Sequence, residues 1–92
     1  MMNLIEVAKN GDVNGLRRLH LSTDGVDINF RCPPDGTTAL YWAACNGHVA
    51  ACDWLIRHSA DVNLTTEKSG STPLHGAADR GHTDCVRVLL RR

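Results

Sequence analysis

One stretch of this chain occurs twice, and the repetition constrains the fold more than any other feature of the sequence. Residues 36–48 align without gaps on residues 70–82, at a step of 34 residues. A fainter third copy precedes them, because residues 4–13 match residues 40–49. Repetition at such a period is typical of stacked supersecondary units, in which each unit buries its apolar face against its neighbour.

The repeated segment carries start and stop signals for a helix. Thr38 and Thr72 can each accept a hydrogen bond from an early backbone amide that has no partner within the helix. Pro73 suits the first helical position, where its missing amide costs nothing. Gly47 and Gly81 can adopt the left-handed conformation that ends a helix. A second apolar periodic segment starts directly after each glycine, so the sequence predicts a helical hairpin in each unit.

The segments after the glycines have apolar residues at three-and-four spacing, which predicts one buried stripe on each second helix. A two-helix unit is too small to bury this surface alone, so neighbouring units are expected to stack and to present one elongated concave face. Residues 27–37 and 61–71 are rich in turn-forming residues and are expected to project as extended loops or hairpins. The predicted stripes are Val13, Leu16 and Leu19; Val49, Cys52, Leu55 and Ile56; and Cys85, Val86, Leu89 and Leu90.

These motifs resemble the ankyrin repeat, whose unit is a turn followed by two antiparallel helices. They are Thr72-Pro73-Leu74-His75, Ala77-Ala78, Gly81-His82 and Ala60-Asp61-Val62-Asn63, the last of which is matched by residues 26–29. The resemblance implies an all-α solenoid of stacked helix-turn-helix units joined by hairpin-like loops. It also implies a single domain over residues 1–92, with repeats at about 1–34, 35–68 and 69–92. In such a unit His75 is a structural hydrogen-bonding partner of the loop.

Two departures from the family pattern bear on the structure. Ser59 stands where the family usually has a glycine after the second helix, so this turn either strains a serine or ends the helix differently. Tyr41 and Trp42 replace the usual His-Leu, which places a large side chain on the first helix near the groove. Gly76 holds the position of Trp42 in the next unit. An indole that faces a bare glycine predicts either complementary packing or a pocket.

Composition limits the compartment and the class of partner. Ten basic side chains balance ten acidic ones, so no overall charge attracts nucleic acid or anionic lipid. No apolar stretch approaches the roughly 20 residues that a membrane span needs. The four cysteines lack the dense spacing of a secreted disulfide framework, which favours a reducing interior, the cytoplasm or the nucleus. Basic residues on second helices are expected to complement helix dipoles rather than to bind phosphate; they are Arg17, Arg18, Arg87, Arg91 and Arg92.

Pairs of histidine and cysteine raise the question of a metal site. His48 and Cys52 are one helical turn apart, and His82 and Cys85 repeat the arrangement. The spacings of known zinc sites are absent, and the Gly-His start of the second helix explains both histidines, so no metal or other cofactor is expected. The chain also lacks a nucleophile turn, a phosphate loop and a kinase-like signature, and a solenoid offers no enclosed cleft. No catalytic residue is therefore assigned.

The family geometry implies a set of contact residues for a partner protein. Trp42 and Arg80 would dominate such an interface, because binding energy concentrates in a few tryptophan and arginine side chains. Burial of Trp42 in the core is an equally open alternative. The implied hairpin contacts are Asp35, Thr37, Ser69 and Ser71, and the implied groove contacts are Lys9, Asn10, Trp42, Cys45, Asn46, Asp79 and Arg80.

The resulting hypothesis is a non-catalytic scaffold that binds another protein through its groove and loop tips. The alternative is a targeting segment of a longer enzyme, such as a kinase, a ubiquitin ligase or an acyltransferase, with catalytic residues beyond Arg92. The last repeat lacks a polar outer face, with Val86, Val88 and Leu89 placed as in an internal repeat, so we expect a longer array or self-association at this end. Met1-Met2-Asn3 leads straight into the first helix, as in a natural start.

Overall fold

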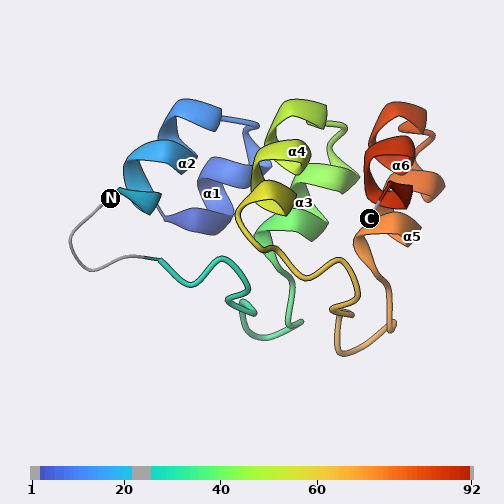
Figure 1. Ribbon diagram of the computed structural model, residues 1–92. Coiled ribbons are helices and arrows are strands. Elements are labelled where there is room, and N and C mark those ends of the chain that lie inside the picture. Colours follow the sequence, from blue (N-terminus) through green and yellow to red (C-terminus); the bar gives the residue numbers. More distant parts are fainter. Residues whose placement is uncertain (1–2, 22–25, 92) are drawn as a thin grey trace.

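Six helices form three antiparallel pairs in the computed structural model, which describes residues 3–21 and 26–91. They are α1 (Leu4–Lys9), α2 (Val13–His20), α3 (Ala39–Cys45), α4 (Val49–Arg57), α5 (Pro73–Asp79) and α6 (Thr83–Leu90). The first helices α1, α3 and α5 lie side by side in one layer, and the second helices α2, α4 and α6 lie in another (Figure 1). The described residues contain no strand, and one isolated bridge pairs Cys32 with Thr37. The predicted all-α stack of helix pairs is therefore confirmed.

Helices α3 and α5 begin at the predicted caps. The hydroxyl of Thr38 accepts a hydrogen bond from the Tyr41 amide, at 3.1 Å. Thr72 does the same for the His75 amide, and the His75 ring in turn accepts from the Thr72 amide at 3.0 Å. This capping box confirms the structural role expected for His75. Each cap satisfies a backbone donor that the helix itself leaves free, so the sequence signal acts locally.

The helices end as their glycines suggest. Gly47 and Gly81 both have a φ of 74°, in the left-handed region, and each lies in the turn between two helices of a pair. Ser59 has the same φ of 74° after α4, so the strained-serine alternative is the correct one. The left-handed conformation brings the Cβ of any residue but glycine close to the following carbonyl. Ser59 is exposed, and the chain tolerates this cost at the surface.

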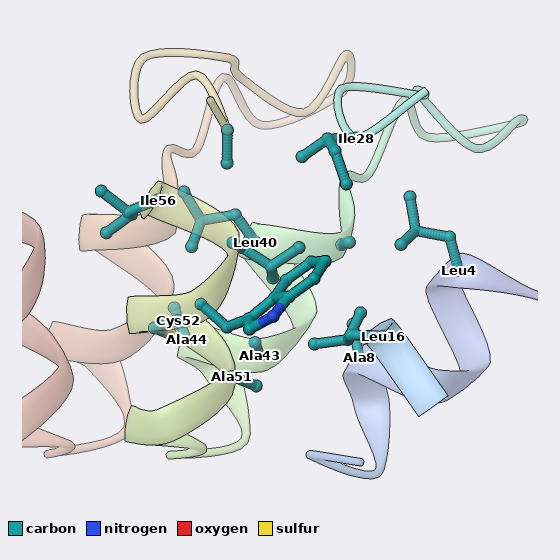
Figure 2. Close-up of a cluster of buried hydrophobic side chains, with 14 of the residues drawn as sticks. Leu4, Ala8, Leu16, Ile28, Leu40, Ala43, Ala44, Ala51, Cys52 and Ile56 are labelled. Carbon is teal, nitrogen blue, oxygen red and sulfur yellow. The ribbon is translucent and has the colours of Figure 1, made fainter. Parts of the chain in front are cut away.

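Small residues allow the helices to approach closely. Ala8, Ala43, Ala51 and Ala77 are all 0% exposed, as is Leu16. Figure 2 shows that such side chains from the first two helix pairs converge with Leu40, Cys52 and Ile28 between the layers. The core thus extends along the stack instead of closing around one centre, as expected when each pair depends on its neighbours.

The predicted stripes are correct at most positions and wrong at two. Leu16, Cys52, Leu55 and Cys85 are fully buried. Val49, the first residue of α4, is 36% exposed and lines an open cavity with the first residues of α6. Leu90 is 66% exposed, since α6 packs on α4 and α5 but no helix of the described residues covers its far side. The corresponding residue one repeat earlier, Ile56, is 5% exposed.

Neighbouring repeats meet at glycines, but the expected pairing of Trp42 with Gly76 is wrong. A Cβ atom added to Gly76 would collide with the thiol of Cys45 and would lie at contact distance, 3.4 Å, from the Tyr41 ring. Cys45 therefore fills the space over Gly76. Trp42 instead contacts Lys9 of the preceding repeat. Lys9 is the last residue of α1 and Trp42 lies in the middle of α3, so a side chain at the end of one first helix reaches the middle of the next first helix.

Candidate binding surface

The first helices and the two long loops face each other and enclose open cavities. We call this side of the molecule the concave surface, formed by α1, α3 and α5 together with residues 27–37 and 61–71. One cavity of about 310 Å³ lies between α1 and the first loop, with Leu4, Ile5, Lys9, Phe30 and Cys32 in its lining. Phe30 is 47% exposed there.

The floor of the concave surface begins with Lys9 and Trp42. The Lys9 ammonium lies 4.4 Å from the centroid of the indole, a cation–π contact. Trp42 is half-buried: one part packs against the hydrophobic core and another lines a cavity. The two alternatives left open for Trp42 are thus both partly realised.

Asn46 connects all three repeats along this floor. Its side-chain amide donates to the Lys9 carbonyl at 3.0 Å, and the Arg80 guanidinium donates to its oxygen at 3.5 Å. The ring of His48 also contacts the Lys9 carbonyl, at 2.8 Å. Lys9, Trp42, Asn46 and Arg80 therefore form one connected row. Asn10 and Asp79 are exposed beside it.

Two of the expected contact residues are almost completely buried. Cys45 is 3% exposed, because its thiol occupies the space above Gly76. Thr37 is 8% exposed, because its carbonyl accepts from the Cys32 amide at 2.7 Å and holds the loop closed. The prediction for Cys45 is wrong as a surface contact, whereas Thr37 still contributes to the lining of a cavity, and both residues have structural roles.

The two long loops form equivalent hairpins, one repeat apart. The Cys32 amide donates to Thr37 in the first hairpin, and the Thr66 amide donates to the Ser71 carbonyl at 2.9 Å in the second. The hairpins are joined where the Glu67 amide donates to the Asp35 carbonyl at 2.7 Å. Arg31 also donates a side-chain hydrogen bond to the Thr65 carbonyl. The two loops project on the same side of the stack (Figure 1), and these hydrogen bonds join them.

The predicted hairpin contacts differ in how free they are. Ser69 is exposed, but its hydroxyl bonds with that of Thr66 at 2.7 Å and with that of Ser71 at 2.9 Å. Ser71 is only partly exposed. Asp35 is partly exposed, and its carboxylate lies 3.7 Å from the Lys68 ammonium. Asp35 and Ser69 therefore remain accessible at the tips.

A second cavity, of about 170 Å³, lies between α3 and the hairpins, and we call it the hairpin pocket. Three of its lining residues were missed by the sequence analysis: Tyr41, Thr66 and Lys68. The repeat step of 34 could have indicated Thr66, because it places Thr66 at the position of Cys32 in the preceding hairpin. The full lining is Asp35, Thr37, Tyr41, Trp42, Thr66, Lys68 and Ser69.

The buried cysteines are poor nucleophiles. Burial is the main cause that raises the pKa of the thiols of Cys45, Cys52 and Cys85 above the ordinary value. Burial also raises the pKa of the Tyr41 hydroxyl, together with its hydrogen bond to Cys45. A nucleophilic cysteine needs its thiolate at neutral pH. These sites therefore favour packing over covalent chemistry.

Within residues 3–21 and 26–91, no three or more His, Cys, Asp or Glu side chains are grouped so that they could hold a metal ion. His48 binds a backbone carbonyl, and Cys52 is buried beside Cys85. None of the helices in this part of the chain has the length and apolar character to cross a membrane. Met1, Met2 and Arg92, which entered the sequence expectations, lie outside the described residues.

Known proteins resemble this chain in sequence and in structure. The crystal structure of the human ASB11 ankyrin repeat domain matches with a TM-score of 0.86 and 34% identity, over 99% of this chain and 39% of that one. Palmitoyltransferase akr1 of Schizosaccharomyces pombe is 34% identical over 61 residues, 66% of this chain and 9% of the relative. Palmitoyltransferase AKR1 of Gibberella zeae is 37% identical over 59 residues, 64% of this chain and 8% of the relative.

The chain thus spans less than a tenth of the curated relatives that it matches. The family model for three copies of the ankyrin repeat matches residues 4–92, which is nearly the whole chain. Repeats of this kind mediate protein–protein interaction and are typically non-catalytic. The matched motifs are the ones whose caps, turns and hairpins the structure shows, and the chain belongs to the ankyrin repeat family.

Proposed function

We propose that this chain binds a partner protein on its concave surface and catalyses no reaction itself. The observation that carries the proposal is the connected row of Lys9, Trp42, Asn46 and Arg80, with open cavities between the first helices and the hairpins. Tryptophan and arginine contribute most to interfaces when they are held in place and partly exposed. The second helices α2, α4 and α6, which we call the outer helices, lie in the other layer of the stack (Figure 1).

Site-specific photo-crosslinking tests this assignment. A photoreactive amino acid is placed singly at Ser69 or Arg80 on the concave surface, and at Leu21 or Arg57 on the outer helices as matched controls. All four residues are exposed, so folding should be preserved. We expect adducts to a common partner from the two concave positions and none from the controls. Adducts only from Leu21 and Arg57 would show that the outer face binds.

A paired substitution checks the contribution of the row. Trp42→Ala combined with Arg80→Ala should weaken binding of the crosslinked partner by more than tenfold, since each hot-spot truncation costs about 2 kcal/mol or more. Leu21→Ala combined with Arg17→Ala removes a large side chain and an arginine from the outer face, and should leave binding unchanged. Circular dichroism of each variant verifies that the helices are intact.

A second candidate function is supported by the names of the two fungal relatives. We propose as the alternative that the segment recruits substrates or directs location within a longer acyl-transferring enzyme. The repeat segment would then bind proteins while the chemistry occurs elsewhere. Reading the transcript beyond the codon for Arg92 separates the candidates, because an enzyme requires a long downstream coding region. A stop codon at that point would rule the alternative out.

The end of the stack and the cysteines suggest where and how the chain works. Leu90 and the partly buried Leu74, Val86 and Val88 leave an apolar end face, which supports self-association as a further proposal. Sedimentation equilibrium tests it, and a mass of 10.0 kDa at all concentrations would exclude it.

The four cysteines are unpaired, which supports a reducing compartment, the cytoplasm or the nucleus. A fluorescent fusion of the full gene product tests that location.

A further inference from the structure

The hairpin pocket combines aromatic walls with one acidic group. The rings of Tyr41 and Trp42 lie with centroids 5.8 Å apart and planes at 81°, so an edge of one meets a face of the other. Both residues line the pocket, as does Asp35 from the first hairpin. Aromatic faces carry negative charge density and attract cations, especially beside a carboxylate. The walls therefore favour a positively charged guest over an anionic one.

One carboxylate oxygen of Asp35, Oδ1, is buried without a hydrogen-bond donor among the described residues. The Lys68 ammonium is 3.7 Å away, too far for a hydrogen bond, and 82% of the Lys68 side chain is exposed. Such surface pairs contribute little, because water screens them and a long side chain must be held in place. Lys68 can thus be displaced from Asp35 at low cost.

Trp42 already attracts one cation within the molecule. Lys9 places its ammonium over the indole from α1, on the side of the preceding repeat. No carboxylate among the described residues pairs with Lys9, so attraction by the ring accounts for this position. Trp42 also lines the hairpin pocket, together with Tyr41 and the hairpin residues Asp35 and Lys68.

We infer that the hairpin pocket binds the guanidinium group of an arginine side chain on the partner protein. This inference rests on the proposed function, because it names the chemistry that the concave surface recognises. Guanidinium is planar, carries five donors and no acceptor, and can stack on an aromatic ring while it donates two parallel hydrogen bonds to a carboxylate. It therefore supplies the donor that Asp35 Oδ1 lacks. An apolar guest would enclose this oxygen without satisfying it, and an anionic guest would be repelled.

The test is an NMR titration with a small probe, so it needs no identified partner. N-acetyl-arginine amide is titrated into ¹⁵N-labelled protein, and the Trp42 indole signal is followed with Trp54 as the internal reference. We expect a saturable shift of Trp42 with arginine, at least severalfold weaker binding with the lysine analogue, and no saturable shift with the glutamine analogue. Equal shifts with all three probes, or none with arginine, would overturn the inference.

Two variants with opposite expected effects make the test sharper. Asp35→Asn should weaken binding of the arginine probe by roughly tenfold or more, which is the usual loss of affinity when a charged hydrogen bond is removed. Lys68→Ala should strengthen it by about two- to fivefold, because the competing cation is removed. Asp84→Asn removes an equivalent exposed charge on α6 and should have no effect. Weaker binding with Lys68→Ala would show that the pocket prefers an anion and would refute the inference.

The outcomes for this pocket and for the concave surface can be told apart. Concave crosslinks together with no arginine binding would refute the pocket assignment and leave the surface intact. Arginine binding together with crosslinks only from the outer helices would refute the partner surface, and with it the pocket's role in partner recognition.

Discussion

The ammonium of Lys9 lies 4.4 Å from the ring centroid of Trp42, across the seam between the first and second helix pairs. The same lysine supplies its backbone carbonyl to Asn46 and His48 of the second pair. One residue at the end of α1 is thus used twice, through its side chain and its backbone. The seam and the proposed binding surface consequently share the same atoms.

A double-mutant cycle measures this contact. Lys9→Met and Trp42→Leu, alone and combined, should show a coupling free energy of about 0.5–1 kcal/mol in urea unfolding, as expected for a partly exposed cation–π pair. Lys9→Met keeps an apolar stem and removes the charge. Arg57→Met with Trp42→Leu is the control, because Arg57 pairs with Asp53 on the outer helix α4. A coupling as large for the control pair would contradict the assignment.

Substitution of Gly76 tests the close packing between the second and third repeats. Alanine in a helix is usually favoured over glycine by about 1 kcal/mol. Here the added Cβ collides with the Cys45 thiol, and overpacking of this kind costs about 1–3 kcal/mol. Gly76→Ala should therefore lower the free energy of unfolding, whereas the same change in a Cys45→Ala background should raise it. The packing assignment is contradicted if Gly76→Ala changes the free energy of unfolding in the same direction in both backgrounds.

Ser59→Gly should stabilise the protein. The φ of 74° destabilises the folded state by about 1–2 kcal/mol for any residue with a Cβ. Glycine removes this strain, but its greater conformational freedom in the unfolded chain offsets part of the gain. We expect a net gain of roughly 0.5–1 kcal/mol in chemical unfolding. Ser59→Ala is the matched control and should bring no gain, because alanine keeps the Cβ. Equal stabilisation by both variants would mean that the serine hydroxyl, not the backbone, is the unfavourable element.

The buried thiols should make stability fall at alkaline pH. Burial raises the pKa of Cys45, Cys52 and Cys85 in the folded state, while in the unfolded chain thiols ionise near a pH of about 8.5. Below that pH both states hold the proton and the thiols contribute their full stability. As pH rises further, the unfolded state releases protons that the folded state keeps, so the free energy of unfolding decreases.

The measurement is urea unfolding between pH 7 and pH 10.5 with a reductant present. Each buried thiol can contribute a slope of at most about 1.4 kcal/mol per pH unit. Cys52→Ala and Cys85→Ala should each flatten the alkaline decline. Val7→Ala removes buried apolar volume but no thiol, so it should lower stability by the same amount at every pH. A decline unchanged by the cysteine substitutions would exclude these groups as its cause.

The local signals in the sequence were sufficient for the helix pairs. Thr38 and Thr72 cap their helices, Gly47 and Gly81 end theirs, and the hairpins lie where turn residues cluster. Each of these features depends on a few consecutive residues and on backbone hydrogen bonds that the segment must satisfy itself. The alternation of these signals at a step of 34 residues was enough to predict the stack.

The candidate surface was predictable only in part. Lys9, Asn46 and Arg80 lie on the concave surface as expected, but Cys45 and Thr37 are buried. Tyr41 and Lys68, which line the hairpin pocket, were not among the expected contacts. Alignment of the repeats shows which residues occupy equivalent positions in successive units. It does not show how far each side chain reaches into the next repeat.

The sequence by itself therefore determined the unit, its period and the places where helices α3 and α5 begin and end, because these follow from short-range hydrogen bonding and apolar spacing. The tertiary structure decided which side chains meet across the seams: Lys9 with Trp42, and Cys45 with Gly76. Those pairings depend on the offset between stacked helices, which is set by the combined volume of all the small residues in the core. No single position encodes that offset, so only the packed molecule reveals it.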